Sequence, residues 1–507
     1  MKFNDSQITS IKLVSISFPG RDLSLAPVSI KSYILKDPEI SKKFSVHISQ
    51  YDINTSNEDI FQDLETGNEQ IYGFTAYVWN FEKILVLAGK LKETNPKRII
   101  VLGGPEASGL AEQILVKYDF VDFVFNGEGE YAFKSFLTTK DLSTVPGLIY
   151  RKNGMVLSNP EAQMKNLDDL VLPYESQDYR NYLENSKTPV RAAIETSRGC
   201  PFSCAYCTWG ERKMKYFSLE KIKPAFEFLF NHPKVRTVYI TDSNPFLRKE
   251  RSLELLNFLI EANKHKKPVT FEVSPEYLTN ERIVELISQL NNEEFAFGVQ
   301  STAPEVLSRI KRKFNAELYR KNIKLIRQQN KAVEFWFSLI IGLPGDNYSQ
   351  FIDSVDFVLK LKPEGIYFHE LLCLPGSDLY KNPSEYGIEY MEEPPHKLIS
   401  NESFPQFEYN QAKELAFLIY LLHRTSNLKQ SFFDLFQHQN GQGLRLVDYY
   451  IQFQTFLKDQ LDVLDGKSIQ DLTSWFFEQT ASDFLQDQHK VEQLTHLYHS
   501  FETGVTS

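Results

Sequence analysis

Cys200-Pro-Phe-Ser-Cys204-Ala-Tyr-Cys207 gathers three of the four cysteines of this 507-residue chain into one short segment. The segment follows the apolar run 192–196, which we expect to form a strand. Structural zinc normally takes four protein ligands, and a four-iron four-sulfur cluster normally takes four thiolates. Because no fourth cysteine lies nearby, the triplet indicates a cluster with one iron left open for another ligand. Buried free thiols or a disulfide are the alternatives, and this spacing rarely arises by chance.

The spacing C-x3-C-x2-C, with Tyr206 just before the third cysteine, resembles the radical S-adenosylmethionine (SAM) enzymes. The resemblance implies that Cys200, Cys204 and Cys207 bind a 4Fe-4S cluster and that its open iron chelates the amino and carboxylate groups of SAM. It also implies that the reduced cluster cleaves SAM to a 5'-deoxyadenosyl radical, which abstracts hydrogen from unreactive carbon. An external electron donor of the flavodoxin or ferredoxin type belongs to this chemistry.

Composition and charge set bounds on partners. The chain is 42% hydrophobic and carries a net charge of -10, with no clustered basic run. This balance argues against a nucleic-acid partner and favours a small molecule or a peptide as substrate. We see no membrane-spanning segment and no secretory signal at Met1, so we expect a cytoplasmic protein whose thiols stay reduced.

The first 150 residues alternate short β-rich runs with helical patterns. We expect strands at 11–18, 44–51, 71–77, 99–103 and 121–125, with a helix at 80–92 between the third and the fourth. This order predicts an α/β fold with a doubly wound, Rossmann-like parallel sheet over residues 1–150.

Two glycine-rich turns follow the last two of these strands: Gly103-Gly-Pro-Glu-Ala-Ser108 and Gly127-Glu-Gly-Glu130. Each alone is also compatible with an ordinary turn. Together, and ahead of the cysteine segment, they resemble the cobalamin-binding domain of cobalamin (B12)-dependent radical SAM enzymes. The resemblance implies that the following residues contact cobalamin: Phe18, Arg21, Gly103, Gly104, Pro105, Glu106, Gly127, Glu128 and Gly129.

The lower face of cobalt lacks an obvious ligand in this sequence. Some cobalamin methyltransferases use a D-x-H-x-x-G motif after the first strand, but this chain has Ser17-Phe-Pro-Gly-Arg-Asp22 there. His47 falls inside a predicted strand, where a structural role is favoured. We therefore expect a lower face that is empty or occupied by water, with Arg21 nearby.

The rest of the chain divides into three parts. Residues 151–189 are expected to form a hairpin and a linker. Residues 190–385 are expected to form a partial (β/α)6 barrel, with strands at 192–196, 237–241, 269–274, 295–300, 333–341 and 366–372 and helices at 219–230, 253–264, 281–290 and 318–329. Ser218 and Thr279 are expected N-caps. Residues 386–507 predict a helical domain, with helices at 411–422, 447–457, 468–477 and 491–500.

Polar residues and turns stand at the ends of the predicted barrel strands, where the radical SAM resemblance places SAM contacts. Each is also compatible with an ordinary role at the barrel rim. The candidates are Tyr206, Asp242, Glu272, Gln300, Arg312, Gly342 and Pro344. Within the sixth strand, alternation places Tyr367 and His369 on one face, where they are candidates for catalysis, although a structural role is favoured. Cys373 is not at cluster spacing and is expected to be structural.

These features point to a cobalamin-dependent radical SAM enzyme. The resemblance implies transfer of a methyl group from methylcobalamin to an unactivated carbon, after the 5'-deoxyadenosyl radical removes a hydrogen atom from it. A radical cyclisation, rearrangement or ring contraction is the alternative within the same cofactor set, and a non-catalytic cobalamin or SAM sensor is the alternative from another class. A methylthiotransferase is disfavoured, because that family carries three further cysteines in its N-terminal domain and this chain has none before Cys200.

Overall fold

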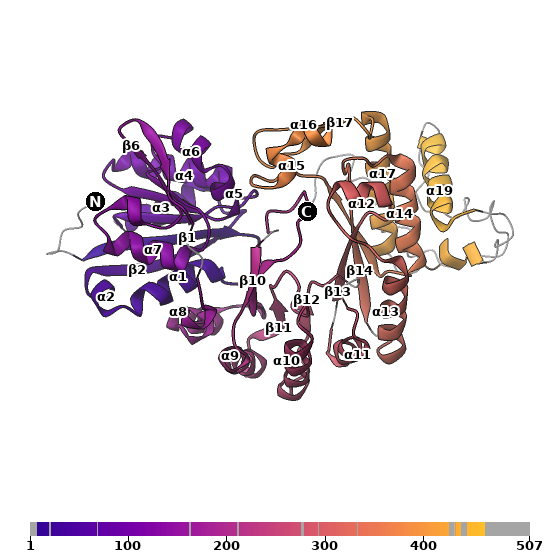
Figure 1. The fold of residues 1–507 in the computed structure, drawn as a ribbon, viewed down its shortest axis with the longest axis horizontal. Coiled ribbons are helices and arrows are strands. Elements are labelled where there is room, and N and C mark those ends of the chain that lie inside the picture. The colour runs from indigo at the N-terminus through magenta and orange to yellow at the C-terminus, as the bar shows by residue number, and fades with distance from the viewer. Residues whose placement is uncertain are drawn as a thin grey trace.

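The computed structural model describes most of the chain (Figure 1). The described residues are 8–19, 22–67, 69–161, 164–209, 212–274, 278–292, 294–331, 333–424, 430, 432–434, 436–437 and 444–461. The expected helices at 468–477 and 491–500 lie outside them. Among the described residues, no helix is both long enough and apolar enough to cross a membrane.

The N-terminal part is a seven-stranded sheet in the order β2-β1-β3-β4-β5-β6-β7. The first five strands pair in parallel, which confirms the predicted doubly wound sheet. These strands are β1 (Thr9–Ser17), β2 (Phe44–Asp52), β3 (Ile71–Thr75), β4 (Ile99–Gly103) and β5 (Phe123–Phe125). The hairpin β6 (Leu148–Lys152) and β7 (Met155–Ser158) turns at Asn153-Gly154, as expected, and adds two antiparallel strands to the same sheet.

Alternating side chains cover both faces of this sheet with helices. Ile11 and Leu13 of β1 pack on one face against α1 (Leu25–Leu35), α2 (Pro38–Lys43) and α7 (Gly129–Thr138). Val14 and Ile16 pack on the other face against α3 (Asn57–Thr66), α4 (Phe81–Thr94) and α6 (Ala111–Lys117). The helices that follow β1 and β3 therefore lie on opposite faces. In such sheets, ligands bind at this switch point, beyond the carboxyl ends of the strands.

Six strands of the next part form the wall of the partial barrel. They are β8 (Val190–Ile194), β11 (Val235–Ile240), β12 (Val269–Phe271), β13 (Glu294–Gln300), β14 (Glu334–Ile341) and β15 (Gly365–Glu370). They pair in parallel as two three-stranded sheets, and a bridge between Glu272 and Ala296 joins the two sheets. All six expected barrel strands are present.

Helices cover the outer face of the barrel. They are α9 (Leu219–Asn231), α10 (Lys249–Ala262), α11 (Glu281–Gln289), α13 (Ala316–Gln329) and α14 (Tyr348–Lys360). The short helix α12 (Pro304–Arg309) packs instead with Ala205 of the cysteine segment. Along β13, buried Phe295 and Phe297 alternate with less buried residues and belong to the large outer core. Ser218 caps α9 as expected, since its Oγ accepts from Lys221 N. Thr279 was the wrong residue for α11, because Asn280 Oδ1 accepts from Ile283 N instead.

Between the sheet and the barrel, the chain runs through η2 (Leu167–Asp169), η3 (Pro173–Glu175) and α8 (Gln177–Asn185). After the barrel come α15 (Asp378–Lys381), α16 (Pro383–Tyr386), β16 (Ile388–Tyr390) and β17 (Leu398–Asn401), which lie between the N-terminal sheet and the barrel at the top of Figure 1. The expected helices at 411–422 and 447–457 are present within α17 (Gln406–Arg424) and α19 (Leu446–Leu461), and both pack against α14.

The two adjacent glycines after β4 predict a sharp contrast in stability. Gly104 has φ +98° and ψ 169°, and a Cβ there would lie 2.5 Å from Ala76 O. This conformation is almost restricted to glycine, so Gly104→Ala should lower the free energy of unfolding by about 1–3 kcal/mol. Gly103 has open space at its Cβ position, so Gly103→Ala should leave the unfolding curve nearly unchanged. Denaturant unfolding of both variants measures the difference, and equal stability would contradict this account of the turn.

Candidate active site

A cavity of ≈ 870 Å³ lies between the carboxyl edge of the N-terminal sheet and the barrel. From the N-terminal part, the loops after β1, β3, β4 and β5 contribute Asp22, Tyr77, Pro105 and Asn126–Glu130, among others. From the barrel side, the cavity is lined by Arg191, Ala193, Glu195, Ser197, Arg198, Gly199, Tyr239, Thr241 and Ser243. The expected cobalamin turns and the residues that lead into the cysteine loop therefore share one cavity.

The expected cobalamin residues divide into two groups in the structure. Gly104, Pro105, Gly127, Glu128 and Gly129 line the cavity, whereas Phe18 and Gly103 lie outside its lining. Arg21 falls outside the described residues.

Glu106 and His47 also lie away from the cavity. The Glu106 side chain is buried, and its Oε1 lies 2.7 Å from His396 Nε2. Glu106 therefore belongs to the packing of the turn. His47 is exposed in the middle of β2.

Tyr77 is a cavity residue that sequence reasoning missed. It lies just after β3, at the switch point of the sheet, and its ring stacks on Trp79 with centroids 4.4 Å apart. Asn80 Oδ1 accepts a hydrogen bond from Tyr77 N, which fixes the start of this loop. The position directly after the third strand was the available signal, because ligands bind beside the switch point.

The cysteine loop joins two short antiparallel strands, β9 (Ser197–Cys200) and β10 (Arg212–Tyr216). Cys200, Cys204 and Cys207 are half-buried free thiols. Cys207 N donates to Cys204 O at 3.0 Å, Ala205 N donates to Ile310 O at 3.0 Å, and Trp209 N lies 3.4 Å from Cys207 Sγ. The loop is thus fixed both internally and against the segment that follows α12.

The donor set of this loop suits a four-iron cluster better than a single metal ion. Among the residues that the structure describes, no group of three or more His, Cys, Asp or Glu side chains could hold a metal ion. In a four-iron cluster, each cysteine binds a different iron, so the three sulfurs do not converge on one point. The three half-buried thiols on one loop supply three ligands for such a cluster.

Four of the expected residues come together at the end of β13. Arg312 Nη1 lies 3.3 Å from Tyr206 Oη and 3.9 Å from Cys204 Sγ, and Arg312 Nη2 also donates to Gly298 O. Gln300 has φ +69°, and its buried Oε1 has no hydrogen-bond partner in the structure. A buried carbonyl oxygen without a partner is costly, so Gln300 Oε1 is suited to accept from a ligand. Positive charge and an open acceptor therefore lie beside the cysteines.

The Asp242 carboxylate is buried and accepts hydrogen bonds from neighbouring protein groups. Its carboxylate accepts from Thr196 N at 2.7 Å, from Thr196 Oγ1 at 2.6 Å and from Ser197 Oγ at 2.6 Å. Burial raises the pKa of Asp242, and these hydrogen bonds oppose that rise. Asp242 therefore fixes the chain between β8 and β9, and its neighbours Thr241 and Ser243 are the residues that line the cavity.

The turn after β14 packs against the C-terminal elements. Gly342 has φ +89°, and a Cβ there would lie 2.8 Å from both Leu398 and Tyr409. Asn401 Nδ2 donates to the carbonyl oxygens of Gly342 and Leu343, and Pro344 is buried. The turn is therefore held in place by β17 and α17.

Tyr367 and His369 lie on the same face of β15, as alternation predicted. Tyr367 stacks on Trp336 with centroids 4.8 Å apart and donates to Glu294 Oε1 at 3.2 Å. Desolvation lowers the pKa of His369, and Glu272 opposes that change. Glu272 in turn accepts from Tyr239 Oη at 3.2 Å. The opposite face of β15 carries Glu370, which pairs with Lys413 of α17.

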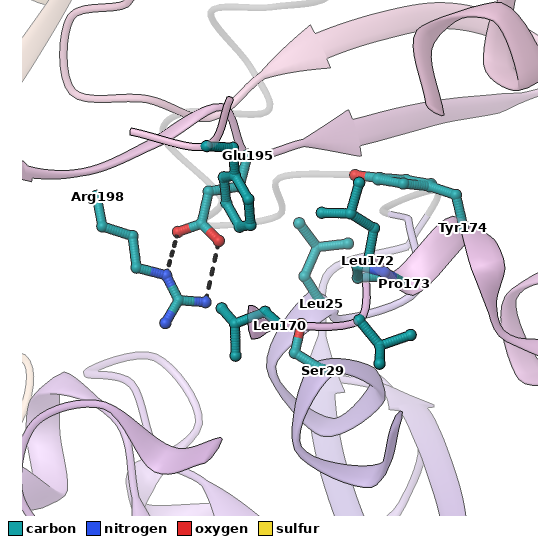
Figure 2. A pocket seen from close by; sticks show the side chains of 10 residues that line it. Leu25, Ser29, Leu170, Leu172, Pro173, Tyr174, Glu195 and Arg198 are labelled. Carbon is teal, nitrogen blue, oxygen red and sulfur yellow. Dashed lines mark hydrogen bonds and ion pairs between the residues drawn. The ribbon is translucent and has the colours of Figure 1, made fainter. Parts of the chain in front are cut away.

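Arg198, another residue that sequence reasoning missed, forms two bidentate ion pairs. Nε and Nη2 donate to Glu195 at 2.8 and 3.0 Å, and Nη2 and Nη1 donate to Glu130 at 2.7 and 3.1 Å. Figure 2 shows the Glu195 pair beside Leu25 and Ser29 of α1 and Leu172 of the linker. Burial raises the pKa of Glu195. Burial also raises that of Glu130, but Arg198 outweighs it and the pKa of Glu130 lies below its ordinary value.

Two family models match this chain. The radical SAM superfamily model matches residues 194–358, and the B12 binding domain model matches residues 39–137. The chain thus combines a radical SAM domain with a B12-binding domain. The two matched domains imply a 4Fe-4S cluster, SAM and cobalamin as its cofactors.

Curated relatives of this chain include named methyltransferases. The chain is 28% identical to the cobalamin-dependent radical SAM methyltransferase TokK of Streptomyces tokunonensis, over 64% of this chain and 51% of that protein. It is 26% identical to 2-(S-pantetheinyl)-carbapenam-3-carboxylate methyltransferase of Streptantibioticus cattleyicolor, over 73% of this chain and 58% of that protein. The chain thus spans little more than half the length of these curated relatives.

The fold of this chain is also found in a solved structure. The cobalamin-dependent SAM radical enzyme OxsB, with aqua-cobalamin and SAM bound, matches with a TM-score of 0.67 at 14% identity. The match covers 99% of this chain and 82% of that chain. At this identity the likeness concerns the fold, and it includes the sheet, the barrel and the C-terminal elements together.

The cysteine loop predicts a clear difference between cysteine variants. Replacing Cys200, Cys204 or Cys207 with Ala should remove a cluster ligand and abolish reductive cleavage of SAM. Cys373 is fully buried and lies outside the loop, so Cys373→Ala should keep its iron content and visible absorption. Anaerobic reconstitution with iron and sulfide analysis measures this. A Cys204→Ala protein with a full cluster and undiminished 5'-deoxyadenosine formation would contradict the assignment.

Asp346 predicts a pH dependence of stability. It is buried in the turn after β14, and burial raises its pKa from 3.8 to about 7. Because the folded state holds this proton more tightly than the unfolded chain does, the free energy of unfolding should fall as the pH rises from about 4 to about 7. Asp346→Asn keeps an oxygen for Asn347 N and should be more stable at pH 8 by a few kcal/mol, on the order expected from the shift.

Denaturant unfolding between pH 4 and 8 tests the Asp346 prediction. Exposed Asp119 supplies the control, since Asp119→Asn should leave the pH profile of the parent unchanged. An Asp346→Asn profile parallel to that of the parent would show that this carboxyl is not the titrating group.

Proposed function

We propose that this protein is a cobalamin-dependent radical SAM methyltransferase that methylates an unactivated carbon of a small molecule or peptide. One observation carries the proposal: the glycine turns of the N-terminal sheet and the residues that lead into the cysteine loop line the same cavity. A shared cavity lets two cofactors act on a single substrate held between them. The two relatives named as methyltransferases support this reaction class over cyclisation.

The cofactors, when bound, supply hydrogen abstraction and methyl transfer, and the protein supplies their positions. We assign residues 1–150 to the cobalamin domain, 151–189 to a linker, 190–385 to the radical SAM barrel and 386–507 to a helical C-terminal domain. In this assignment, Gly104, Pro105, Gly127 and Gly129 allow close backbone approach to cobalamin. Cys200, Cys204 and Cys207 bind three irons of the cluster.

SAM is held at the end of β13 in this proposal. Arg312 is the cation that neutralises the methionine carboxylate, and Gln300 offers its unpartnered Oε1 as an acceptor. Tyr206 packs beside the cysteines, where Arg312 orients its hydroxyl. Asp242 does not contact SAM in this proposal. Its hydrogen bonds hold Thr196 and Ser197 in place, and so position the strand that leads to Cys200.

The barrel interior orients the substrate in this proposal. Arg191, Tyr239 and Glu272 stand on β8, β11 and the chain after β12, and Tyr367 and His369 stand on β15. His369 can exchange a proton with the substrate, and the stacked pair of Trp336 and Tyr367 offers a flat apolar surface. A mass label on the methyl group of SAM follows its transfer into any product.

The test is anaerobic incubation of the fully loaded protein with trideuteromethyl-SAM, a low-potential reductant and a small-molecule extract. We expect 5'-deoxyadenosine and a product that carries the trideuteromethyl group on carbon, both detected by mass spectrometry. Formation of 5'-deoxyadenosine with a changed product but no deuterium would favour a radical cyclisation or rearrangement. A loaded protein that forms neither compound would favour a cobalamin or SAM sensor.

A further inference from the structure

The two glycine turns carry three carboxylates, and each pairs with a basic side chain outside the N-terminal sheet. Glu106 Oε1 lies 2.7 Å from His396 Nε2, in the segment after the barrel. Glu128 Oε1 pairs with Lys215 Nζ on β10. Glu130 Oε1 pairs with Arg198 Nη2 on β9 at 2.7 Å. Gly104, Gly127 and Gly129 line the cavity, and Glu128 and Glu130 reach its wall while their carboxylates are paired with basic side chains.

Glu130 and Arg198 are the most strongly connected of these pairs. The Glu130 side chain is 5% exposed and that of Arg198 is 17% exposed, so water screens the pair little. Arg198 stands two residues before Cys200, and Gly199 O between them accepts from Ser243 Oγ at 2.7 Å. Glu130 belongs to the first turn of α7, which begins at Gly129. One guanidinium thus connects the start of the cysteine loop with the second glycine turn.

Glu128 strengthens this connection on the other strand of the cysteine hairpin. Its carboxylate pairs with Lys215 of β10 through Oε1 and accepts from Met164 N at 2.6 Å through Oε2. Arg198 and Lys215 lie opposite each other on β9 and β10. Both strands of the hairpin that carries the cysteines are therefore tied to the second glycine turn.

Glu106 makes the equivalent contact for the first glycine turn. The His396 and Glu106 side chains are 0% and 2% exposed. Nδ1 of His396 lies 3.2 Å from Met391 O, so both ring nitrogens of His396 lie within hydrogen-bond distance of an oxygen atom. His396 also has φ +58°, a conformation that costs free energy for a side chain of this size.

We propose that Glu106, Glu128 and Glu130 are positioning residues that set the distance between cobalamin and the iron–sulfur cluster. The inference rests on the proposed function and goes beyond it, because it assigns these carboxylates to docking and leaves cofactor contact to the glycine backbone. Each carboxylate already has a cationic or ring N–H partner, and removal of one partner leaves a buried charge uncompensated. Reaction geometry tolerates little displacement, since about 1 Å can cost about 100-fold in rate.

The experiment measures that distance directly. With cobalamin in the cob(II) state and the cluster reduced by one electron, both centres carry an unpaired spin, and their dipolar coupling reports their separation. Glu130→Gln, Glu128→Gln and Arg198→Lys are the variants, and all three keep similar side-chain volume. Glu58→Gln is the control, because Glu58 forms an exposed ion pair with Lys90 within the N-terminal part.

We expect Glu130→Gln and Arg198→Lys to change or broaden the dipolar coupling, while cluster content stays full and the Kd for cobalamin stays within about threefold of the parent. The double variant Glu130→Gln, Arg198→Lys should change the dipolar coupling no more than either single variant does, because the two residues form one contact. Glu58→Gln should match the parent in all three measurements.

Methyl transfer from SAM to cobalt gives a second measurement. The carbon–sulfur bond of SAM breaks with its electron pair left on sulfur, giving S-adenosylhomocysteine, and the methyl group bonds to cobalt through the electron pair of cob(I)alamin, which titanium(III) citrate generates. This rate should fall about 10-fold or more in Glu130→Gln.

Two results would overturn the inference. One is a Glu130→Gln protein with unchanged dipolar coupling and unchanged methyl transfer. The other is a cobalamin Kd raised more than about 10-fold with unchanged coupling, which would make Glu130 a cofactor ligand. Failure of the proposed function has a different signature, since the parent protein itself would then bind no cobalamin or form no 5'-deoxyadenosine.

Discussion

Asp22 holds the first strand of the N-terminal sheet against the first strand of the barrel. Its Oδ2 accepts from Ala193 N of β8 and from Tyr179 Oη of α8, both at 2.7 Å, and its Oδ1 accepts from Leu23 N. Burial raises the pKa of Asp22 to about 6, so these contacts are made against a desolvation cost. The position of the cavity depends on this junction, because it turns the carboxyl edge of the sheet toward the inner face of β8.

The electrostatics of the cavity also depend on how the carboxyl edge of the sheet faces the barrel. Arg198 shares one positive charge between Glu130 and Glu195, and the two carboxyls end up with pKa values shifted in opposite directions. Glu130 is the more buried of the two and forms the closer pair with Arg198, whereas Glu195 is more exposed to the cavity. One carboxyl of this triad is thereby fixed as an anion, and the other keeps a proton more readily than an ordinary glutamate.

The sequence allowed the strands of both sheets and the cysteine loop to be predicted, because periodicity and spacing are local properties. It did not reveal side-chain direction. Glu106 and Asp242 stand in expected motifs, yet their carboxylates are used by His396 and by Thr196 and Ser197. Such contacts join residues far apart in the chain, and nothing in the local pattern indicates which face of a turn meets solvent, ligand or protein. Tyr77 was accessible to sequence reasoning, since its place after β3 follows from the topology alone.

The segment after the barrel contacts both the cysteine loop and the first glycine turn. Leu379 N donates to Ala205 O, inside the cysteine loop, at 3.0 Å, and Cys373 N donates to His396 O at 2.9 Å, which holds the residue that reaches Glu106. Gly109 approaches the same segment so closely that a Cβ would lie 2.5 Å from Pro375. The cysteine loop and the first glycine turn thus both pack against this segment. A displacement of the cysteine loop or of the first glycine turn would have to move this segment or break buried contacts. The distance between the two loops is therefore set by packing on both sides of the cavity.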